Sequence, residues 1–324
     1  MNSIVDLFGN CRWKPATGIQ RAFVKHPARD ESPGSYGIIK CGDERIRMSV
    51  VIPTSDADRG GYFRLLLDQI NRQTYPFFEL IIVKGDSRQG RAINIGAALA
   101  RGKYLLTLDD DTSLPDVETF QKMADVLEKY PTIGIAGGNN IVPEQAAFFV
   151  RRAMEEIPRR SWEPVDTITE SDLAEHPCMV MRTKEFKAAG GENELILRGL
   201  DPYLREQFRK IGKRVVVVPG VMYHHLPPDS LAKLLRQFYR NGSQASYTRR
   251  NYPQWIIETP AVHGQFNSNV SFSRRILRFP VLLFKALIAL KFIWFLGESA
   301  YGAGYFRNML FERPLKGDHS QKKD

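Results

Sequence analysis

Three consecutive aspartates, Asp109, Asp110 and Asp111, are the most chemically distinctive group in the sequence. They directly follow the apolar run 103–108, which is typical of a buried strand. Carboxylates this close together oppose one another's ionisation unless a positive charge lies between them. Mg²⁺ or Mn²⁺ would supply that charge, since both prefer hard oxygen ligands and often bind substrate phosphates too. A solvated acidic turn before the next helix is the alternative, and the triplet alone leaves both interpretations open.

The elements that must position these aspartates alternate between strand and helix. The predicted elements, beginning with a strand, are 48–54, 62–73, 79–83, 91–101, 103–108, 115–130 and 133–136. Alternation at this spacing predicts right-handed β-α-β units and a mostly parallel sheet covered by helices. Ligands bind such sheets beyond the carboxyl ends of the strands, which is where Asp86 and the aspartate triplet fall.

The flanking segments are less regular. Strands are predicted at 178–181 and 214–219, and helices at 201–211 and 230–247. Residues 1–47 contain several prolines and glycines without clear periodicity, so we expect an irregular N-terminal extension.

Composition excludes several classes of protein. With 43% hydrophobic and 25% charged residues, the chain is neither disordered nor collagen-like. Cys11, Cys41 and Cys178 are too few and too scattered for a disulfide framework or a cysteine-ligated zinc site, so we expect free thiols in a reducing compartment. The first 25 residues are charged and lack the apolar core of a secretory signal. We therefore expect a cytoplasmic protein.

The stretch 90–111 resembles the nucleotide-sugar half of family 2 glycosyltransferases, which have the GT-A fold. The opening strand Ser49–Thr54 resembles the same family. Further matches in the family's order are Gly134–Gly138, Met181–Arg182, Gly190–Glu194, Gly199–Asp201, Gly212, Pro219 and His224–His225. The resemblance covers about residues 48–250. It implies an α/β fold, with a Rossmann-like, mostly parallel sheet flanked by helices.

The resemblance also implies a division of the chain. Residues 48–228 would form the catalytic domain, with a nucleotide-sugar half at 48–140 and an acceptor half at 141–228. Residues 1–47 would precede it as the extension, and a basic helical region at 229–324 would follow.

Roles for individual residues follow from the same resemblance. Asp109 and Asp111 match the family's DxD element, which binds a divalent ion that bridges the donor diphosphate. His225, or its neighbour His224, falls where many GT-A enzymes have a third metal ligand. Asp201 matches the general base that accepts a proton from the acceptor hydroxyl. The donor-binding candidates are Pro53, Thr54, Asp56, Asp86, Arg91, Asn94, Asp109 and Asp110.

Simpler interpretations exist for several of these residues. Asp201 could be the N-cap of its helix, with Pro202 in the first helical position. Asn94 could be a surface helix residue, and the two histidines could be ordinary strand-end residues. The order in which the motifs occur favours the functional interpretation.

The sequence departs from the family pattern at three places. Val83-Lys84-Gly85-Asp86-Ser87 stands where the family commonly has Val-Asp-Asp-Gly-Ser, so the carboxylate that recognises the base is absent or displaced to Asp86. Leu200 replaces a glutamate beside the base, and Gln207 stands where an arginine is common. The choice of nucleotide is thus open, but the metal site and the base are retained.

The C-terminal region is basic and apolar. Residues 264–324 contain ten Lys or Arg against four acids, which contributes +6 of the net charge of +10. The 18 residues 279–296 are apolar except for Lys285 and Lys291. We expect a helix at 276–297 that lies on an anionic membrane surface, with Arg274, Arg275 and Arg278 facing the headgroups. A buried helix pair or a dimer contact is the alternative.

A second basic segment precedes this region. The helix at 230–247 could bring Arg236 or Arg240 towards donor phosphates or the acceptor groove, or could present a solvated basic face.

Together these features predict an inverting glycosyltransferase that depends on Mg²⁺ or Mn²⁺. It would move a sugar from a nucleotide-diphosphate sugar, with a UDP-sugar favoured, to a hydroxyl of a lipid-linked, glycan or polysaccharide acceptor. It would act peripherally on the cytosolic membrane face. A GT-A-like protein that binds the donor without turnover and a basic nucleic-acid- or membrane-binding protein are the alternatives. We expect no nucleic-acid partner, because the acidic triplet would repel phosphate without a metal. No Gly-x-Gly-x-x-Gly follows the first strand, which argues against a dehydrogenase.

Overall fold

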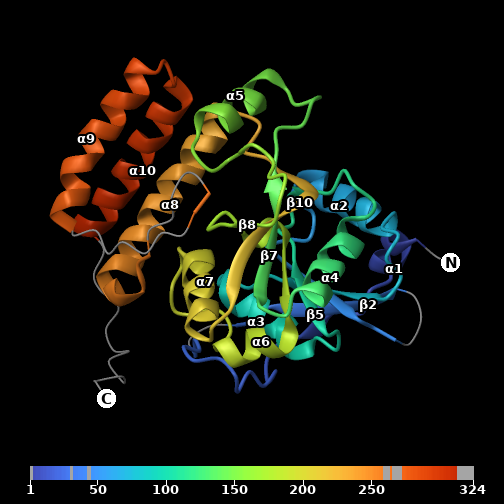
Figure 1. Ribbon diagram of the computed structural model, residues 1–324. Helices are drawn as coiled ribbons and strands as arrows, with labels where there is room; N and C mark the ends of the chain where they lie inside the picture. Colours follow the sequence, from blue (N-terminus) through green and yellow to red (C-terminus); the bar gives the residue numbers. More distant parts are fainter. Residues whose placement is uncertain (1–2, 30–31, 42–44, 258–262, 265–271, 312–324) are drawn as a thin grey trace.

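A ten-stranded mixed sheet runs through the computed structural model, which describes residues 3–29, 32–41, 45–257, 263–264 and 272–311 (Figure 1). The strands are β1 Lys14–Pro15, β2 Ser35–Cys41, β3 Met48–Thr54, β4 Phe78–Lys84, β5 Tyr104–Thr107, β6 Thr112–Ser113, β7 Ile133–Asn140, β8 Thr169–Glu170, β9 Met179–Arg182 and β10 Arg214–His225. Their order is β1-β2-β4-β3-β5-β9-β7-β10-β6, and β8 pairs with β10 beside this path.

The long strands of the sheet mostly share one direction. β3 is parallel to both β4 and β5, and β7 is parallel to β10. β9 lies antiparallel between β5 and β7, so β3, β4, β5, β7 and β10 all point the same way. The carboxyl ends of these strands therefore form one edge, as the alternating pattern predicted.

Helices cover both faces of the sheet. They are α1 Ile4–Gly9, α2 Tyr62–Asn71, α3 Gln89–Leu99, α4 Thr119–Lys129, α5 Phe148–Glu156, α6 Thr183–Ala189, α7 Leu200–Lys210, α8 Leu231–Asn251, α9 Phe272–Ile288 and α10 Phe292–Phe311. Short 3₁₀ turns lie at Arg59–Gly61, His176–Cys178 and Pro253–Trp255. Side chains of α1, α2 and α4 pack on one face, and side chains of α3, α6 and α7 pack on the other. Alternate residues of β3 point to opposite layers: Val50 and Ile52 to the first, Val51 to the second.

The N-terminal segment is more ordered than its sequence predicted. β2 pairs antiparallel with β4 along its whole length, and Ile4 of α1 and Ile39 of β2 are buried in the core. The expectation of an irregular extension at 1–47 is therefore wrong for these parts. The sequence of β2 gives little sign of a strand. Ser35–Cys41 contains a glycine and only two aliphatic residues, so apolar and polar residues do not alternate regularly in it.

The C-terminal region forms a helical hairpin rather than the single helix expected at 276–297. α9 ends at Ile288 and α10 begins at Phe292, and Leu290 between them has a φ of 54°. α10 lies along α8 (Figure 1), where glycines let the two backbones approach closely. A Cβ on Gly242 would lie 2.0 Å from the carbonyl oxygen of Tyr301, and one on Gly304 would lie 2.0 Å from that of Tyr239.

The hairpin is also fastened to α5. The backbone N–H groups of Ile293 and Trp294 donate to Oε2 of Glu156, at 2.7 Å and 3.4 Å, so a buried carboxylate caps the start of α10. Within the part of the chain that the structure describes, no helix has the length and hydropathy needed to cross a bilayer. The basic residues at 313–323 and the side chains of Arg274 and Arg275 lie outside the described residues.

Candidate active site

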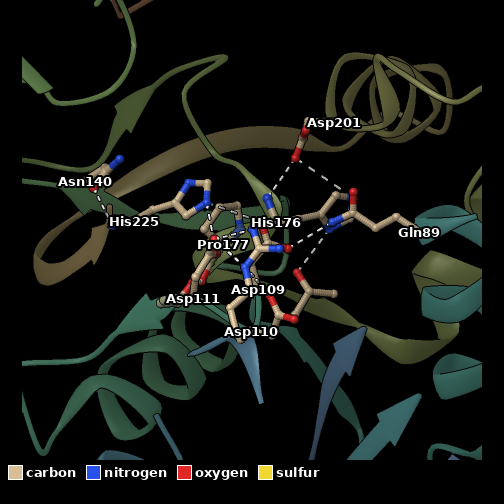
Figure 2. Close-up of polar contacts among 12 residues, drawn as sticks. Gln89, Asp109, Asp110, Asp111, Asn140, His176, Pro177, Asp201 and His225 are labelled. Carbon is tan, nitrogen blue, oxygen red and sulfur yellow. Dashed lines mark hydrogen bonds and ion pairs between the residues drawn. The ribbon is translucent and has the colours of Figure 1, made fainter. Parts of the chain in front are cut away.

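The aspartate triplet lies just beyond the carboxyl end of β5, in the connection to β6. β6 pairs with the end of β10, and the register places Thr112 opposite His225. This pairing brings the His225 ring to the aspartates: its Nε2 lies 3.2 Å from Asp111 Oδ1 and 3.9 Å from Asp109 Oδ2 (Figure 2). The His224 ring is instead 2.8 Å from the carbonyl oxygen of Ile141. Both histidines lie within β10, and His225 is the one that joins the group.

Asp109, Asp111 and His225 form a candidate metal centre. Their ligand atoms all lie within 4.8 Å of one another. The side chains of Asp109 and Asp111 are only 18% and 14% exposed, so the alternative of a solvated acidic turn is wrong. Two carboxylates and one imidazole around a common point suit a divalent ion such as Mn²⁺ or Mg²⁺.

Burial and neighbouring charges shift the pKa values of all three side chains in this centre. Burial raises the pKa of Asp109 to about 7. Burial acts in the same direction on Asp111, but His225 and Arg59 outweigh it and hold the pKa of Asp111 well below its usual range. Burial lowers the pKa of His225, whereas Asp111 raises it, and the net direction is upward. A divalent ion would therefore have to displace protons from His225 and Asp109 before it could bind there.

Among the neighbouring donor-binding candidates, Thr54 contacts the aspartate triplet directly. Its hydroxyl donates to Asp110 Oδ2 at 2.7 Å and accepts from the backbone N–H of Ala57 at 2.9 Å. Pro53 is buried within β3. The exposed carboxylate of Asp56 accepts from the backbone N–H groups of Asp58 and Arg59, and so shapes the loop beside the triplet.

Asp86, Arg91 and Asn94 are engaged elsewhere. The Arg91 guanidinium pairs with both oxygens of Asp86, each at 2.8 Å. Asn94 donates to the carbonyl oxygen of Glu192 at 2.9 Å and to Glu194 Oε1 at 3.0 Å. Asn94 is fully buried, so the interpretation as a surface residue is wrong. These side chains join α3 to adjacent loops, and their role in donor binding stays a prediction.

Asp201 lies near the aspartate triplet, in the first turn of α7 (Figure 2). Gly199 is the N-cap, so the alternative of an Asp201 cap is wrong. Asp201 Oδ1 accepts from the backbone N–H of His176 at 2.8 Å, and the side chain is 29% exposed. Burial raises the pKa of Asp201, but His176 and Arg205 lower it by more, so the pKa lies below its usual range. The carboxylate is therefore held rigidly in its ionised form, which is the form a general base needs.

Several residues of the site were missed by sequence reasoning. The Nε2 atom of His176 lies 2.8 Å from Glu192 Oε1 and 4.0 Å from Asp201 Oδ1. The amide of Gln89 donates to Asp109 Oδ1 at 2.9 Å, and the Arg59 guanidinium lies on Asp111. The Gly190–Glu194 stretch drew attention to Glu192, but no spacing signal links it to His176. Gln89 and Arg59 carry no sequence signal at all.

A groove of about 410 Å³ opens beside the metal centre. Arg59 and Asp111 line one end of it, and residues 226–229 follow. Arg236 and Arg240 of α8 line the groove with exposed side chains. The basic helix predicted at 230–247 thus faces the site.

Comparison with known proteins identifies the central part of this arrangement. Residues 86–186, which contain the aspartate triplet, match the model of glycosyl transferase family 2. This match covers about a third of the chain. Asp201 and His225 come from the chain that follows the family 2 region and complete the site. A search of curated proteins finds no match.

A solved structure shares the fold around the family 2 region. The mannosyltransferase PcManGT from Pyrobaculum calidifontis, in complex with GDP-Man and Mn²⁺, aligns with a TM-score of 0.51 and 14% identity, over 90% of this chain and 93% of that chain. At this identity the alignment shows the shared GT-A fold. S. aureus TarS 1-349 in complex with UDP-GlcNAc aligns with a TM-score of 0.44 and 11% identity, over 81% of this chain and 91% of that chain. That similarity is too low to support an argument.

Proposed function

We propose that this protein is an inverting glycosyltransferase that moves a sugar from a nucleotide-diphosphate sugar to a hydroxyl of a lipid-linked, glycan or polysaccharide acceptor. One observation carries the proposal: the ligand atoms of Asp109, Asp111 and His225 lie within 4.8 Å of one another, where they could hold a cation, and Asp201 is close enough to Asp109 to raise its pKa. The family 2 match over 86–186 and the fold shared with a mannosyltransferase solved with GDP-Man and Mn²⁺ support it.

The residues of the site would divide the work of a single displacement. Asp201, ionised and held by the His176 backbone N–H, accepts the proton of the acceptor hydroxyl as its oxygen attacks the anomeric carbon. The bond between that carbon and the diphosphate oxygen breaks, and the electron pair leaves with the nucleotide diphosphate. A divalent ion at Asp109, Asp111 and His225 would stabilise the negative charge on that leaving group. One displacement inverts the anomeric configuration.

Two supporting contacts keep the carboxylates in place for this reaction. Gln89 binds Asp109, and Thr54 binds Asp110, each through a direct hydrogen bond from a side chain of a neighbouring element. Side chains oriented in this way lose little freedom when the donor binds, which lowers the cost of reaching the reactive geometry.

A donor screen tests the proposal. The purified chain would be incubated with UDP-, GDP- and dTDP-sugars, with Mn²⁺, Mg²⁺ or EDTA, while thermal stability and nucleotide release are followed. Stabilisation by one nucleotide class that EDTA abolishes is the expected result, followed by a product of inverted anomeric configuration. Stabilisation without release or transfer would favour a donor-binding protein without turnover. No response to any donor would contradict the donor site.

We further propose that the protein acts at an anionic membrane surface on the cytosolic side, where the α9–α10 hairpin contacts lipid. The exposed apolar side chains of this hairpin favour that location over free solution. Large ones on α9 and in the turn are Val281, Phe284, Leu287, Ile288 and Leu290; those on α10 are Phe292, Leu296, Phe306, Met309, Leu310 and Phe311. Apolar surface of this extent usually marks an interaction site.

A further inference from the structure

The Arg59 guanidinium contacts Asp111, one of the carboxylates of the candidate metal centre. Its Nη2 atom lies 2.8 Å from Asp111 Oδ2, its Nε atom lies 3.2 Å from the same oxygen, and Nε is 3.5 Å from Asp110 Oδ1. The other oxygen of Asp111 faces His225. Both oxygens of this proposed metal ligand are therefore already in contact with a positively charged or hydrogen-bonding group.

The loop that carries Arg59 has an unusual backbone. Ala57 and Arg59 have φ values of 61° and 50°, in the left-handed region that side-chain-bearing residues seldom adopt, and Gly60 and Gly61 follow with positive φ. Such residues persist only where their surroundings hold them. Here the holding groups are Thr54, which bonds both Ala57 and Asp110, and Asp56, which bonds the Arg59 N–H. The conformation of the loop is thus tied directly to the aspartates.

A divalent ion would change the balance of charge around Arg59. The guanidinium and the ion would share the negative charge of Asp111 and repel each other across a few ångströms. Arg59 is 39% exposed and lines the groove that also contains Arg236 and Arg240. A guanidinium released from Asp111 would meet phosphate oxygens there in the bidentate geometry that arginine favours.

We propose that Arg59 balances the charge of Asp111 before the divalent ion binds, and that it turns to the donor diphosphate once the ion is in place. This inference rests on the proposed function, because it assumes that the centre binds an ion and a diphosphate. Arg59 is a binding residue in this scheme. When the ion is the only ligand, Arg59 competes with it for Asp111. When the diphosphate is also bound, Arg59 contacts the diphosphate and so favours the binding of both.

The test measures binding of Mn²⁺ alone and then of inorganic pyrophosphate at saturating Mn²⁺, by isothermal titration calorimetry with the full chain. Arg59→Gln removes the competing charge, so we expect Mn²⁺ to bind about three- to tenfold more tightly than in the wild type. Pyrophosphate should then bind about tenfold more weakly. Arg64→Gln is the matched control: it removes the same charge from an exposed position on α2 and should change either affinity by less than about twofold.

Arg59→Lys separates charge from folding, because it keeps the cation on the same loop. Its Mn²⁺ affinity should stay near that of the wild type. Equal or weaker Mn²⁺ binding by Arg59→Gln would overturn the inference, since it would make Arg59 a support of Asp111 and not a competitor. Unchanged pyrophosphate binding would also overturn it. A wild type that binds no Mn²⁺ would contradict the proposed metal centre itself and this inference with it, whereas the other two outcomes leave the proposed function intact.

Discussion

The charge of Asp201 can be removed by substitution without losing the hydrogen bond that positions its side chain. Its Oδ1 atom accepts a hydrogen bond from the His176 backbone, and an asparagine oxygen could accept the same bond. We therefore expect Asp201→Asn to keep the fold and the binding of Mn²⁺ and nucleotide. Transfer should fall about 10²–10⁴-fold, because the amide cannot accept the acceptor's proton. Steady-state transfer assays and calorimetry would separate the two effects.

The control for this substitution is Asp229→Asn, which changes an exposed carboxylate at the rim of the groove. It should leave the turnover rate within about twofold of the wild type. Full transfer by Asp201→Asn would exclude Asp201 as the base.

His176 makes the stability of the fold depend on pH. Burial lowers the pKa of its ring, but Asp201 and Glu192 raise it more strongly, to about 9. Because this value lies above the 6.5 of an unfolded histidine, the ring contributes its full stabilisation below pH 6.5 and loses it as pH rises towards 9. The wild type should therefore lose about 2–3 kcal/mol of unfolding free energy across that window through this group.

Urea unfolding at pH 6.5 and pH 9 measures this contribution. His176→Asn should be less stable at pH 6.5 and should lack most of the decline. His224→Asn, which changes a ring that lies 2.8 Å from the carbonyl oxygen of Ile141, should keep the decline. The same decline in all three proteins would show that His176 is not its source.

At the scale of elements, the strand pairing of β10 determines which histidine enters the site. The sequence predicted a third metal ligand at position 224 or 225, but strand side chains alternate between faces, so a shift of one residue exchanges them. β10 pairs with β7 up to Tyr223 and then with β6, which contains only Thr112 and Ser113, at the two histidines. Two residues are too few to produce a periodic signal, so the choice could not be made from the sequence.

Other elements show where a sequence pattern is enough to predict the structure and where it is not. The helical spacing of Phe63, Leu66, Leu67 and Ile70 predicted α2 correctly, because one face of a helix must be apolar to pack on a sheet. The run 279–296 is apolar nearly throughout and has no glycine or asparagine where the chain turns, so nothing marks the break at Leu290. The contacts of Arg91 with Asp86 and of Asn94 with Glu192 could not be predicted from the position of these residues in a motif.

The packing of α8 against α10 depends on the missing side chains of two glycines. Gly304→Val would place a Cβ 2.0 Å from the Tyr239 carbonyl oxygen, which requires the two helices to separate. We expect a loss of about 1–3 kcal/mol and faster proteolysis within α10. Ala303→Val is the matched control, because Ala303 is exposed on the same helix. Equal melting temperatures for the two variants would show that the close approach of the backbones does not occur.

On the scale of the whole molecule, charge and exposed apolar surface coincide on the α9–α10 hairpin. Residues 272–311 contain six Lys or Arg and a single acid, Glu298. Val281, Phe284 and Ile288 form one stripe along α9, and they are 51%, 63% and 67% exposed. The same hairpin is capped by Glu156 of α5 and packed on α8, so it is joined to the rest of the described structure at two places. An anionic lipid surface matches both the charge and the apolar character.

The last prediction tests that match with vesicles. The wild type should sediment with vesicles that contain phosphatidylglycerol, and much less with pure phosphatidylcholine. Added salt should weaken the binding, because it screens the attraction between the basic residues and the headgroups. Phe284→Asp combined with Ile288→Asp should weaken binding at least about tenfold, since it removes two apolar anchors and adds two repelling charges.

Val117→Asp is the control for these substitutions: Val117 is 42% exposed and lies just before α4, in the sheet-bearing part of the molecule. It should bind vesicles as the wild type does. If the double variant bound equally well, the stripe would not be the contact with lipid. If the wild type bound neither kind of vesicle and the double variant instead abolished self-association, the stripe would cover a second copy of the chain. That result would leave Asp109, Asp111, His225 and Asp201 as proposed but remove the reason to place their reaction at a membrane.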